Sequence, residues 1–242
     1  MKVVCIVQAR MGSERLQGKV IKPILGKPMI LYTLERLKKS KLIDEIVMAT
    51  SNKEIEQPLI EIVKNAGFSF FCGDERDVLK RYVEASEKYN GDVIIRITGD
   101  CPLIDTDIVN NVITSYFMYD YDYVRLDVPN TFARGFDVEI FSKEALKKVE
   151  VQTRGLDESF REHVTLYMYK NPHKFSIGYV KGEELFNKEY RLCVDTVEDF
   201  KLVTQIYKHF KDEYVCAKEV IKYLDRNNEL NKINSNIIQK EV

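Results

Sequence analysis

Residues 3–19 read Val-Val-Cys-Ile-Val-Gln-Ala-Arg-Met-Gly-Ser-Glu-Arg-Leu-Gln-Gly-Lys, and this stretch decides how the rest of the chain is interpreted. Its first five residues form a short apolar run, which predicts a fully buried β-strand over 3–7. A polar stretch containing Gly12 follows, and apolar residues at helical spacing then predict a helix over 29–39. Strand, polar loop and helix in this order indicate the first unit of a parallel α/β sheet.

The same alternation continues along the chain. It predicts strands over 46–49, 69–71 and 92–97 and helices over 55–66, 78–88 and 105–118, with Gly67 and Asp105 as helix caps. The second half is less regular, with strands expected over 122–125, 138–141, 174–180 and 191–194 and helices over 157–169 and 197–209. Strands that alternate with helices predict an α/β fold of three layers, in which helices cover both faces of a mostly parallel central sheet.

Length and charge narrow the class of protein. The chain of 242 residues suits one α/β domain, and no linker-like segment divides it. The polar residues 226–242 are expected to form a surface helix or a frayed end. The formal charge of -1 argues against a nucleic-acid partner, because general nucleic-acid binders normally carry a basic excess.

The cysteines and the first residues bear on the compartment. Five scattered cysteines, none spaced as CxxC, fit a reducing environment. The apolar start ends at Gln8, which is too short for the core of a signal peptide or for a membrane span. We therefore expect a cytoplasmic protein with no membrane partner.

The polar loop after the first strand carries three cations, Arg10, Arg15 and Lys19. Open α/β sheets bind ligands at the carboxyl ends of their strands, and Gly12 lets the backbone approach a ligand closely. Three cations in one short loop match the charge of a triphosphate. The spacing is neither GxxxxGK[ST] nor GxGxxG, and a solvated basic loop is the alternative. We favour phosphate binding.

Two aspartates follow predicted buried strands and are candidate metal ligands. Asp100 comes after the strand over 92–97 and after Gly99, and Asp195 follows the short strand over 191–194. Mg²⁺ in proteins is usually held by one or two carboxylates together with substrate phosphates. Alternatively, Asp100 only ends a turn and Asp195 only caps the next helix. The residues alone leave both explanations open.

Eight segments, taken in order, resemble the cytidylyltransferase family that includes the acylneuraminate and 3-deoxy-manno-octulosonate enzymes. Within it the pattern is most similar to the branch named for spore coat polysaccharide biosynthesis protein F. The matching segments are 8–19 (QARMGSERLQGK), 25–30 (LGKPMI), 49–51 (ATS), 73–82 (GDERDVLKRY), 96–105 (RITGDCPLID), 134–139 (RGFDVE), 161–165 (REHVT) and 194–196 (VDT). The likeness ends near Val203 and covers most of the chain.

The resemblance implies a nucleotide-diphospho-sugar transferase-like, Rossmann-like fold, and a CTP-dependent enzyme that uses Mg²⁺ and forms a homodimer. The nucleotide-binding half would span 1–120 and the acceptor-binding half 121–210. The residues implied to bind CTP are Ala9, Arg10, Gly12, Ser13, Arg15, Lys19, Thr50, Ser51, Arg81, Gly99 and Asp100, and those implied to bind Mg²⁺ are Asp100 and Asp195. The acceptor side would comprise Arg134, Asp137, Glu139, Arg161, Glu162 and His163.

The implied reaction transfers CMP from CTP to an acidic sugar or similar anionic acceptor and releases pyrophosphate, in the synthesis of surface polysaccharide or glycan precursors. The expected catalytic residues are Arg15, Lys19, Asp100 and Asp195. This chain departs from the family in its last motif, where Leu192 and Val197 replace the usual Trp and Pro. We expect different packing there with the Asp195 carboxylate retained.

The acceptor-side motifs also have an interpretation that does not depend on the family. Asp137 and Glu139 share one face if 134–139 is a strand, and two carboxylates beside an arginine can bind sugar hydroxyls. An edge strand with a polar face is the alternative. His163 is expected on a helix, where it is either a general base, since its pKa lies near neutrality, or a hydrogen-bonded structural group.

Two other functions remain open from the sequence. Asp120 and Asp122 form an Asp-x-Asp that mimics the metal motif of nucleotide-sugar glycosyltransferases, although its Tyr-rich flanks favour a surface turn or a dimer contact. The other alternative is a nucleotide-binding relative that has lost activity. The cationic loop argues against the first and the retained carboxylates against the second.

Overall fold

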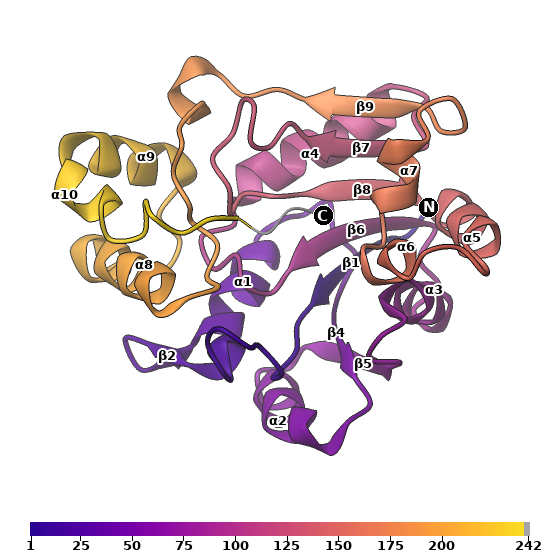
Figure 1. The fold of residues 1–242 in the computed structure, drawn as a ribbon, viewed down its shortest axis with the longest axis horizontal. Helices are drawn as coiled ribbons and strands as arrows, with labels where there is room; N and C mark the ends of the chain where they lie inside the picture. Colours follow the sequence, from indigo (N-terminus) through magenta and orange to yellow (C-terminus); the bar gives the residue numbers. More distant parts are fainter. Residues whose placement is uncertain (240–242) are drawn as a thin grey trace.

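The computed structural model describes residues 1–239, which build a seven-stranded sheet in the order β5-β4-β1-β6-β8-β7-β9 (Figure 1). Its strands are β1 (Val3–Gln8), β4 (Glu45–Ser51), β5 (Ser69–Gly73), β6 (Val93–Thr98), β7 (Tyr123–Leu126), β8 (Glu139–Ser142) and β9 (Ile177–Val180). β1, β4, β5 and β6 pair in parallel, as do β7 and β9, whereas β8 runs antiparallel to both its neighbours. The predicted mostly parallel sheet is confirmed.

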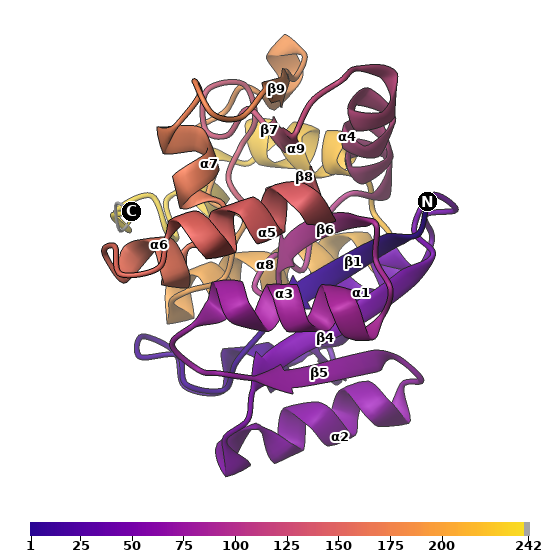
Figure 2. The same ribbon diagram turned by 90° about the vertical axis from the view of Figure 1, so that its right-hand side faces the viewer.

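Helices cover both faces of this sheet. They are α1 (Met29–Leu37), α2 (Gln57–Asn65), α3 (Val78–Lys88), α4 (Thr106–Met118), α5 (Lys143–Gln152), α6 (Ser159–Glu162), α7 (Leu166–Lys170), α8 (Val197–Phe210), α9 (Ala217–Arg226) and α10 (Asn228–Asn231). Figure 2 shows α3 and α5 in front of the strands, with α8 on the far side. Short elements complete the chain: η1 (Lys19–Ile21), β2 (Pro23–Ile24), β3 (Lys27–Pro28), η2 (Glu54–Glu56) and η3 (Glu184–Phe186).

The alternation of side chains along β1 explains the three layers. Val3, Cys5 and Val7 belong to the core beneath α1, α2, α4, α8 and α9, while Val4 and Ile6 belong to the core beneath α3 and α5. Successive residues of a strand point to opposite faces, so a continuous apolar run needs helices on both sides. The buried strand predicted over 3–7 and the three-layer α/β/α architecture predicted from the alternation of strands and helices are therefore confirmed.

Two predicted elements are wrong in detail. The helix expected over 157–169 is split into α6 and α7 at His163, where φ is -102° and ψ is 83°. The break coincides with buried Val164 and with Thr165, whose hydroxyl donates to Glu139 at 2.8 Å. The backbone has left the helical path where these two residues enter the core.

The strand expected over 191–194 is also absent from the described sheet. This segment forms a single bridge, between Arg191 and Arg134. Its amides bond to two different segments, because Leu192 N donates to Arg134 O and Val194 N donates to Asp100 O, each at 2.8 Å. Because successive amides on the same side of this segment bond to two different partners, the segment does not form a continuous β-ladder with either one. The bond from Val194 to Asp100 nevertheless brings Asp195 next to Asp100.

The last described residues match the expected surface helix only in part. α10 is a short helix with no buried residue, but Asn234 beyond it is only 4% exposed and lies against Arg191 and Asp199. Within residues 1–239, no helix combines the length and the apolar character needed to cross a membrane.

Candidate active site

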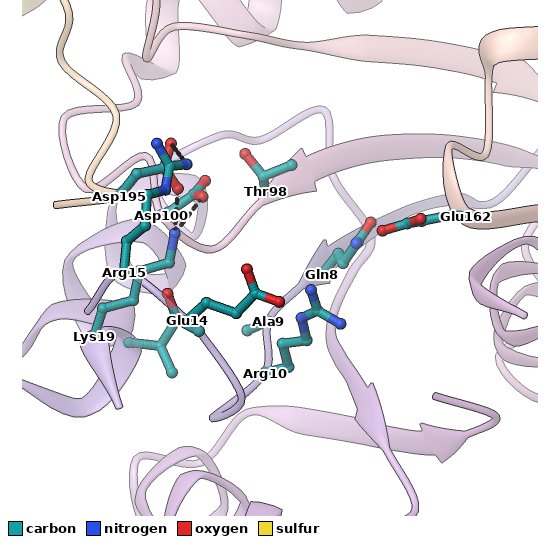
Figure 3. A pocket seen from close by; sticks show the side chains of 12 residues that line it. Gln8, Ala9, Arg10, Glu14, Arg15, Lys19, Thr98, Asp100, Glu162 and Asp195 are labelled. Carbon is teal, nitrogen blue, oxygen red and sulfur yellow. Dashed lines mark hydrogen bonds and ion pairs between the residues drawn. The ribbon is translucent and has the colours of Figure 1, made fainter. Parts of the chain in front are cut away.

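A cavity of about 350 Å³ opens at the carboxyl ends of β1 and β6, the sheet edge at which the sequence predicts ligand binding (Figure 3). The residues that line it are Gln8, Ala9, Arg10, Ser13, Glu14, Arg15, Lys19, Val20, Thr98, Asp100, Glu162 and Asp195. The loop after β1 and the turn after β6 thus form one wall together. All four predicted catalytic residues line this cavity, with Asp195 contributed by the segment after residues 191–194.

Lys19 is at the centre of the charged end of this cavity. Its ammonium donates to Asp100 Oδ2, Asp195 Oδ1 and the carbonyl oxygen of Val194, at 2.8 Å in each case. The Lys19 side chain is only 10% exposed. Two carboxylates that are 95 positions apart in the sequence therefore converge on one cation.

The pKa values of this group follow from its contacts. Burial raises the pKa of Asp100, but the Lys19 ammonium and the hydrogen bonds from Lys19 and Thr98 outweigh burial, so the pKa is lowered. Burial lowers the pKa of Lys19, but the carboxylates of Asp100 and Asp195 outweigh it, so the pKa is raised. Asp100 and Lys19 are both charged at neutral pH.

Arg15 and Arg10 leave the loop in different directions. Arg15 Nη2 lies 3.1 Å from Asp195 Oδ2, and its side chain is 33% exposed. Arg10 is exposed and lines a second cavity as well as the first. A negatively charged ligand in the first cavity would therefore contact the guanidinium groups of Arg10 and Arg15 and the ammonium of Lys19.

The two carboxylates have the chemistry of a magnesium site. An oxygen of each lies 2.8 Å from the same Lys19 nitrogen, so both point at one position. The described residues contain no cluster of three or more His, Cys, Asp or Glu side chains that would cage a metal alone. Mg²⁺ commonly uses two carboxylates and completes its shell with phosphate oxygens and water, so this pair fits the ion in the presence of a nucleotide.

Gly99 has a packing role beside this pair. A Cβ atom added there would lie 2.9 Å from Ala9 Cβ and 2.9 Å from Ile30 Cδ1. The Gly99 amide also donates to Gln8 O at 2.7 Å. Only a residue without a side chain allows the turn after β6 to lie this close to β1, which places Asp100 beside the cationic loop.

Thr50 and Ser51, predicted to bind the nucleotide, are fully buried at the end of β4 and do not line these cavities. Their hydroxyl groups donate to Glu56, at 2.8 and 3.0 Å. Glu56 also accepts from the Met11 amide at 2.9 Å and is itself 1% exposed. Glu56 therefore fixes the loop that carries Arg10 and Arg15. This role could not be predicted from the sequence, because acidic residues are common near helix N-termini.

We expect the Glu56→Ala variant to lower the free energy of unfolding by roughly 2–4 kcal/mol, because a buried donor without a partner costs about 1–3 kcal/mol. Denaturant unfolding measures this change. Glu54→Ala is the matched control, since Glu54 is exposed on the same turn. Equal stability of the two variants would show that the loop does not depend on this carboxylate.

The second cavity, of about 610 Å³, adjoins the first and shares Gln8, Arg10, Glu14 and Glu162 with it. Arg161 lines it too, and donates to Asp77 from Nε at 3.0 Å and from Nη2 at 2.5 Å. Arg161 and Glu162, predicted on the acceptor side, therefore lie beside residues predicted to bind the nucleotide. Their assignment to the acceptor side came from the family resemblance, which does not give their distance from the nucleotide residues.

Two polar atoms beside the second cavity are buried without a hydrogen-bond partner, Gln8 Oε1 and Arg81 Nε. Arg81 is 1% exposed, and its Nη1 donates to Asp74 O at 2.8 Å. Burial lowers the pKa of Arg81. The predicted nucleotide contact of Arg81 would therefore come from a side chain that is almost completely buried in the cavity lining.

A third cavity, of about 140 Å³, collects most of the predicted acceptor residues. It is lined by Arg96, Arg125, Leu126, Asp137, Val138, Glu139, His163, Thr165 and Tyr169. Arg96 and Thr98 both belong to β6, so two residues along one strand connect this cavity to the first. Arg134 does not line any of these three cavities.

The pKa values of the two acceptor-side carboxyl groups, Asp137 and Glu139, are shifted in opposite directions. Burial raises the pKa of Glu139, but Arg96 and Arg125 outweigh it and the pKa is lowered. Burial also raises the pKa of Asp137, and here the Gly135 amide and nearby Arg134 do not outweigh it. Asp137 precedes β8, so the expected shared strand face does not exist, yet both carboxylates face the same cavity.

His163 ends α6 and borders the third cavity. Burial lowers its pKa, and the positive charges of Arg96 and Lys170 lower it further against the effect of Glu162. His163 is therefore mostly neutral at pH 7, the form in which an imidazole can accept a proton. The role of His163 as a general base stays a prediction, with a structural role as the alternative.

The chain is similar to known proteins along almost its whole length. The sequence profile described as cytidylyltransferase matches residues 4–233. An uncharacterized protein of Methanocaldococcus jannaschii is 38% identical, over 99% of this chain and 97% of that protein. The spore coat polysaccharide biosynthesis protein SpsF of Bacillus subtilis is 33% identical, over 93% of this chain and 95% of that protein. A solved cytidylyltransferase structure from Leptospira borgpetersenii superposes with a TM-score of 0.91 at 32% identity, covering all of both chains.

Proposed function

The chain belongs to the cytidylyltransferase family, and we propose that it moves CMP from CTP to an acidic sugar or similar anionic acceptor, with release of pyrophosphate. The observation that carries this proposal is the convergence of Asp100 and Asp195 on Lys19, beside Arg15, at the carboxyl edge of the sheet. A site that concentrates three cationic groups and two carboxylates suits a triphosphate and its metal ion.

In the proposed reaction an acceptor oxygen attacks the α-phosphorus of CTP. A new oxygen–phosphorus bond forms, and the bond between the α-phosphorus and the bridging oxygen breaks as pyrophosphate leaves. Arg15 and Lys19 would turn from the carboxylates to the β- and γ-phosphates and neutralise the charge of the leaving group. Asp100 and Asp195 would hold Mg²⁺, which polarises the α-phosphate when it is bound.

The third cavity is the proposed acceptor site. Arg96 and Arg125 supply positive charge for an anionic acceptor, and Arg96 is fixed by its ion pair with Glu139. Asp137 has a raised pKa, which is favourable for a group that takes a proton from an attacking hydroxyl. Because Arg96 in this cavity and Thr98 in the first lie two positions apart on β6, an acceptor bound here would lie near the α-phosphate of CTP.

The position of Asp120 and Asp122 does not support the glycosyltransferase alternative, because both lie at the opposite edge of the sheet from the candidate active site. Asp120 and Asp122 precede β7, which runs in the direction of β6, so they lie opposite the carboxyl edge. The Asp122 carboxylate accepts from the Ser176 amide at 2.8 Å, as a loop contact.

The biological setting is also part of the proposal. The name of the Bacillus relative, a spore coat polysaccharide biosynthesis protein, supports a role in the synthesis of polysaccharide precursors. The scattered cysteines support a location in the reducing cytoplasm. Exposed Phe117, Met118 and Tyr119 on and after α4 support a homodimer. Sedimentation of the purified protein tests the dimer, which a purely monomeric result would exclude.

The function is tested by pyrophosphate release in the presence of Mg²⁺, with CTP, UTP, ATP or GTP and a panel of acidic sugars. We expect release with CTP alone among the triphosphates, and only with both an acceptor and the metal. CTP at about 100 times its Kd should also stabilise the protein by about 2.7 kcal/mol, measured by thermal unfolding. No stabilisation by any triphosphate would overturn the proposal.

A further inference from the structure

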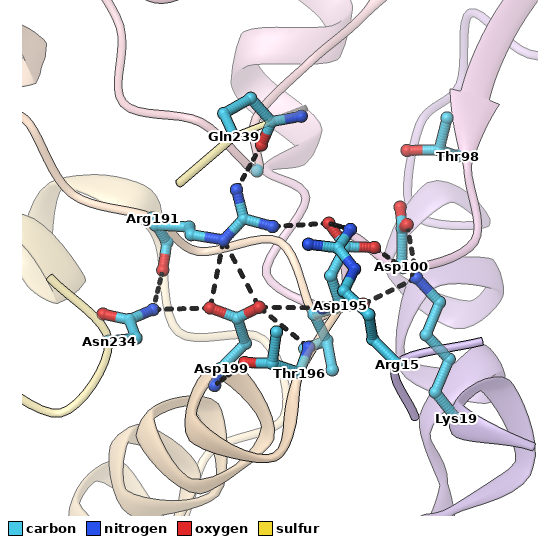
Figure 4. Close-up of polar contacts among 12 residues, drawn as sticks. Arg15, Lys19, Thr98, Asp100, Arg191, Asp195, Thr196, Asp199, Asn234 and Gln239 are labelled. Carbon is cyan, nitrogen blue, oxygen red and sulfur yellow. Dashed lines mark hydrogen bonds and ion pairs between the residues drawn. The ribbon is translucent and has the colours of Figure 1, made fainter. Parts of the chain in front are cut away.

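Asp195 has a third cationic partner that faces away from the cavity. Its Oδ2 accepts from Arg191 Nη2 as well as lying near Arg15 (Figure 4). The Arg191 side chain is 8% exposed and does not line any of the three cavities, in contrast to Arg15. Arg191 is therefore not free to follow an incoming phosphate.

The Arg191 guanidinium is itself fixed by buried groups. Its Nε donates to Asp199 Oδ1 at 3.1 Å, and Asp199 is fully buried at the start of α8. Asp199 Oδ2 also accepts from the backbone amides of Asp195 at 2.9 Å and Thr196 at 3.0 Å. Asp199 thus orients Asp195 in two ways. It accepts a hydrogen bond from the backbone amide of Asp195, and it holds Arg191, which binds the Asp195 carboxylate.

The segment after α10 completes this arrangement. Asn234 Nδ2 donates to Arg191 O at 2.9 Å and to Asp199 Oδ1 at 2.8 Å, and Gln239 Oε1 accepts from Arg191 Nη1. Every nitrogen of the guanidinium group has an acceptor: Asp199, Gln239 or Asp195. Side chains from the end of the chain are thereby connected to a carboxylate of the candidate active site.

We propose that Arg191 is a positioning residue that holds Asp195 for Mg²⁺, and that residues 234–239 are required for this role. The inference rests on the proposed function. When Arg15 and Lys19 turn to the phosphates of CTP, Asp195 loses two of its three cationic partners, and only Arg191 still fixes its carboxylate. A planar guanidinium with three fixed acceptors holds one orientation, which a flexible ammonium cannot do. Residues that orient metal ligands typically change metal affinity by about 10–100-fold when they are replaced.

The test compares CTP binding by calorimetry with Mg²⁺ and with EDTA, in wild type and in two variants, Gln239→Ala and Asn234→Ala. In wild type, Mg²⁺ is expected to tighten CTP binding. Each variant should lose about tenfold of this Mg²⁺-dependent gain, with CTP binding in EDTA unchanged. Gln239→Glu keeps an acceptor for Arg191 and should restore the gain, and Asn236→Ala, at an exposed position of the same segment, should behave as wild type.

A merely structural role gives a different result. It would lower the melting temperature of the unliganded variants while leaving their Mg²⁺-dependent gain equal to that of wild type, and this result would overturn the inference. The same holds if Gln239→Ala matches wild type in every measurement. Failure of the wild-type protein to bind CTP under any condition would instead overturn the proposed function, and with it this inference.

Discussion

Replacing Asp100 with asparagine is expected to lower kcat by about a thousandfold while the protein remains folded. Asparagine has nearly the same size but removes one of the two carboxylates that converge on Lys19. A thousandfold loss corresponds to about 4 kcal/mol of transition-state stabilisation, which is about the size of the loss when a group that stabilises transition-state charge is removed. Steady-state pyrophosphate release measures the effect.

The fold should tolerate this change because Lys19 keeps two of its acceptors. Its ammonium still donates to Asp195 Oδ1 and Val194 O, so no buried cation is left alone. The control is Asp107→Asn, which removes an exposed carboxylate from the first turn of α4. An Asp100→Asn enzyme as active as this control would remove Asp100 from the catalytic residues, and with it the proposed magnesium site.

Residues 3–19 and 92–105 were enough to predict the edge of the sheet at which the site lies. Buried strands can be recognised from local apolar runs, and parallel strands place their carboxyl ends at one edge, so Lys19 and Asp100 could be expected to meet. Asp195 meets them without a strand of its own, through the hydrogen bond from Val194 N to Asp100 O. Its position was predicted correctly, although the element expected to carry it does not form.

The supporting contacts could not be predicted in the same way. Glu56 bonds to the Met11 amide 45 positions away, and Asn234 bonds to the Arg191 carbonyl 43 positions away. Periodicity describes one helix or strand at a time, and it carries no information about which side chain meets a distant backbone group. The charge of Lys19, its place in the loop after the first strand and the family resemblance all predict a phosphate contact, whereas in the structure its ammonium pairs with two carboxylates.

Replacing Lys19 with methionine is expected both to abolish most of the activity and to destabilise the protein. The variant keeps the length and apolar stem of the side chain but leaves Asp100 without its cationic partner in a site where Lys19 is only 10% exposed. Removing one partner of a buried ion pair costs about 3–5 kcal/mol. We expect a loss of about 3 kcal/mol by denaturant unfolding, because Asp195 still has Arg15 and Arg191. The kcat should fall by at least about a hundredfold.

Mg²⁺ should partly restore the stability of the Lys19→Met variant. Such a recovery would show that the variant is destabilised by the loss of positive charge and not by a change in packing. In the Lys19→Met variant the two carboxylates no longer have the ammonium between them, so millimolar Mg²⁺ should raise the melting temperature of the variant more than that of wild type. Lys22→Met, three positions along the same segment, should match wild type both in its stability without Mg²⁺ and in its response to Mg²⁺. If Mg²⁺ stabilises wild type and Lys19→Met equally, the ammonium and the metal do not share the position between Asp100 and Asp195. Lys19 would then be a structural lysine, and the phosphate contacts would have to come from Arg10 and Arg15.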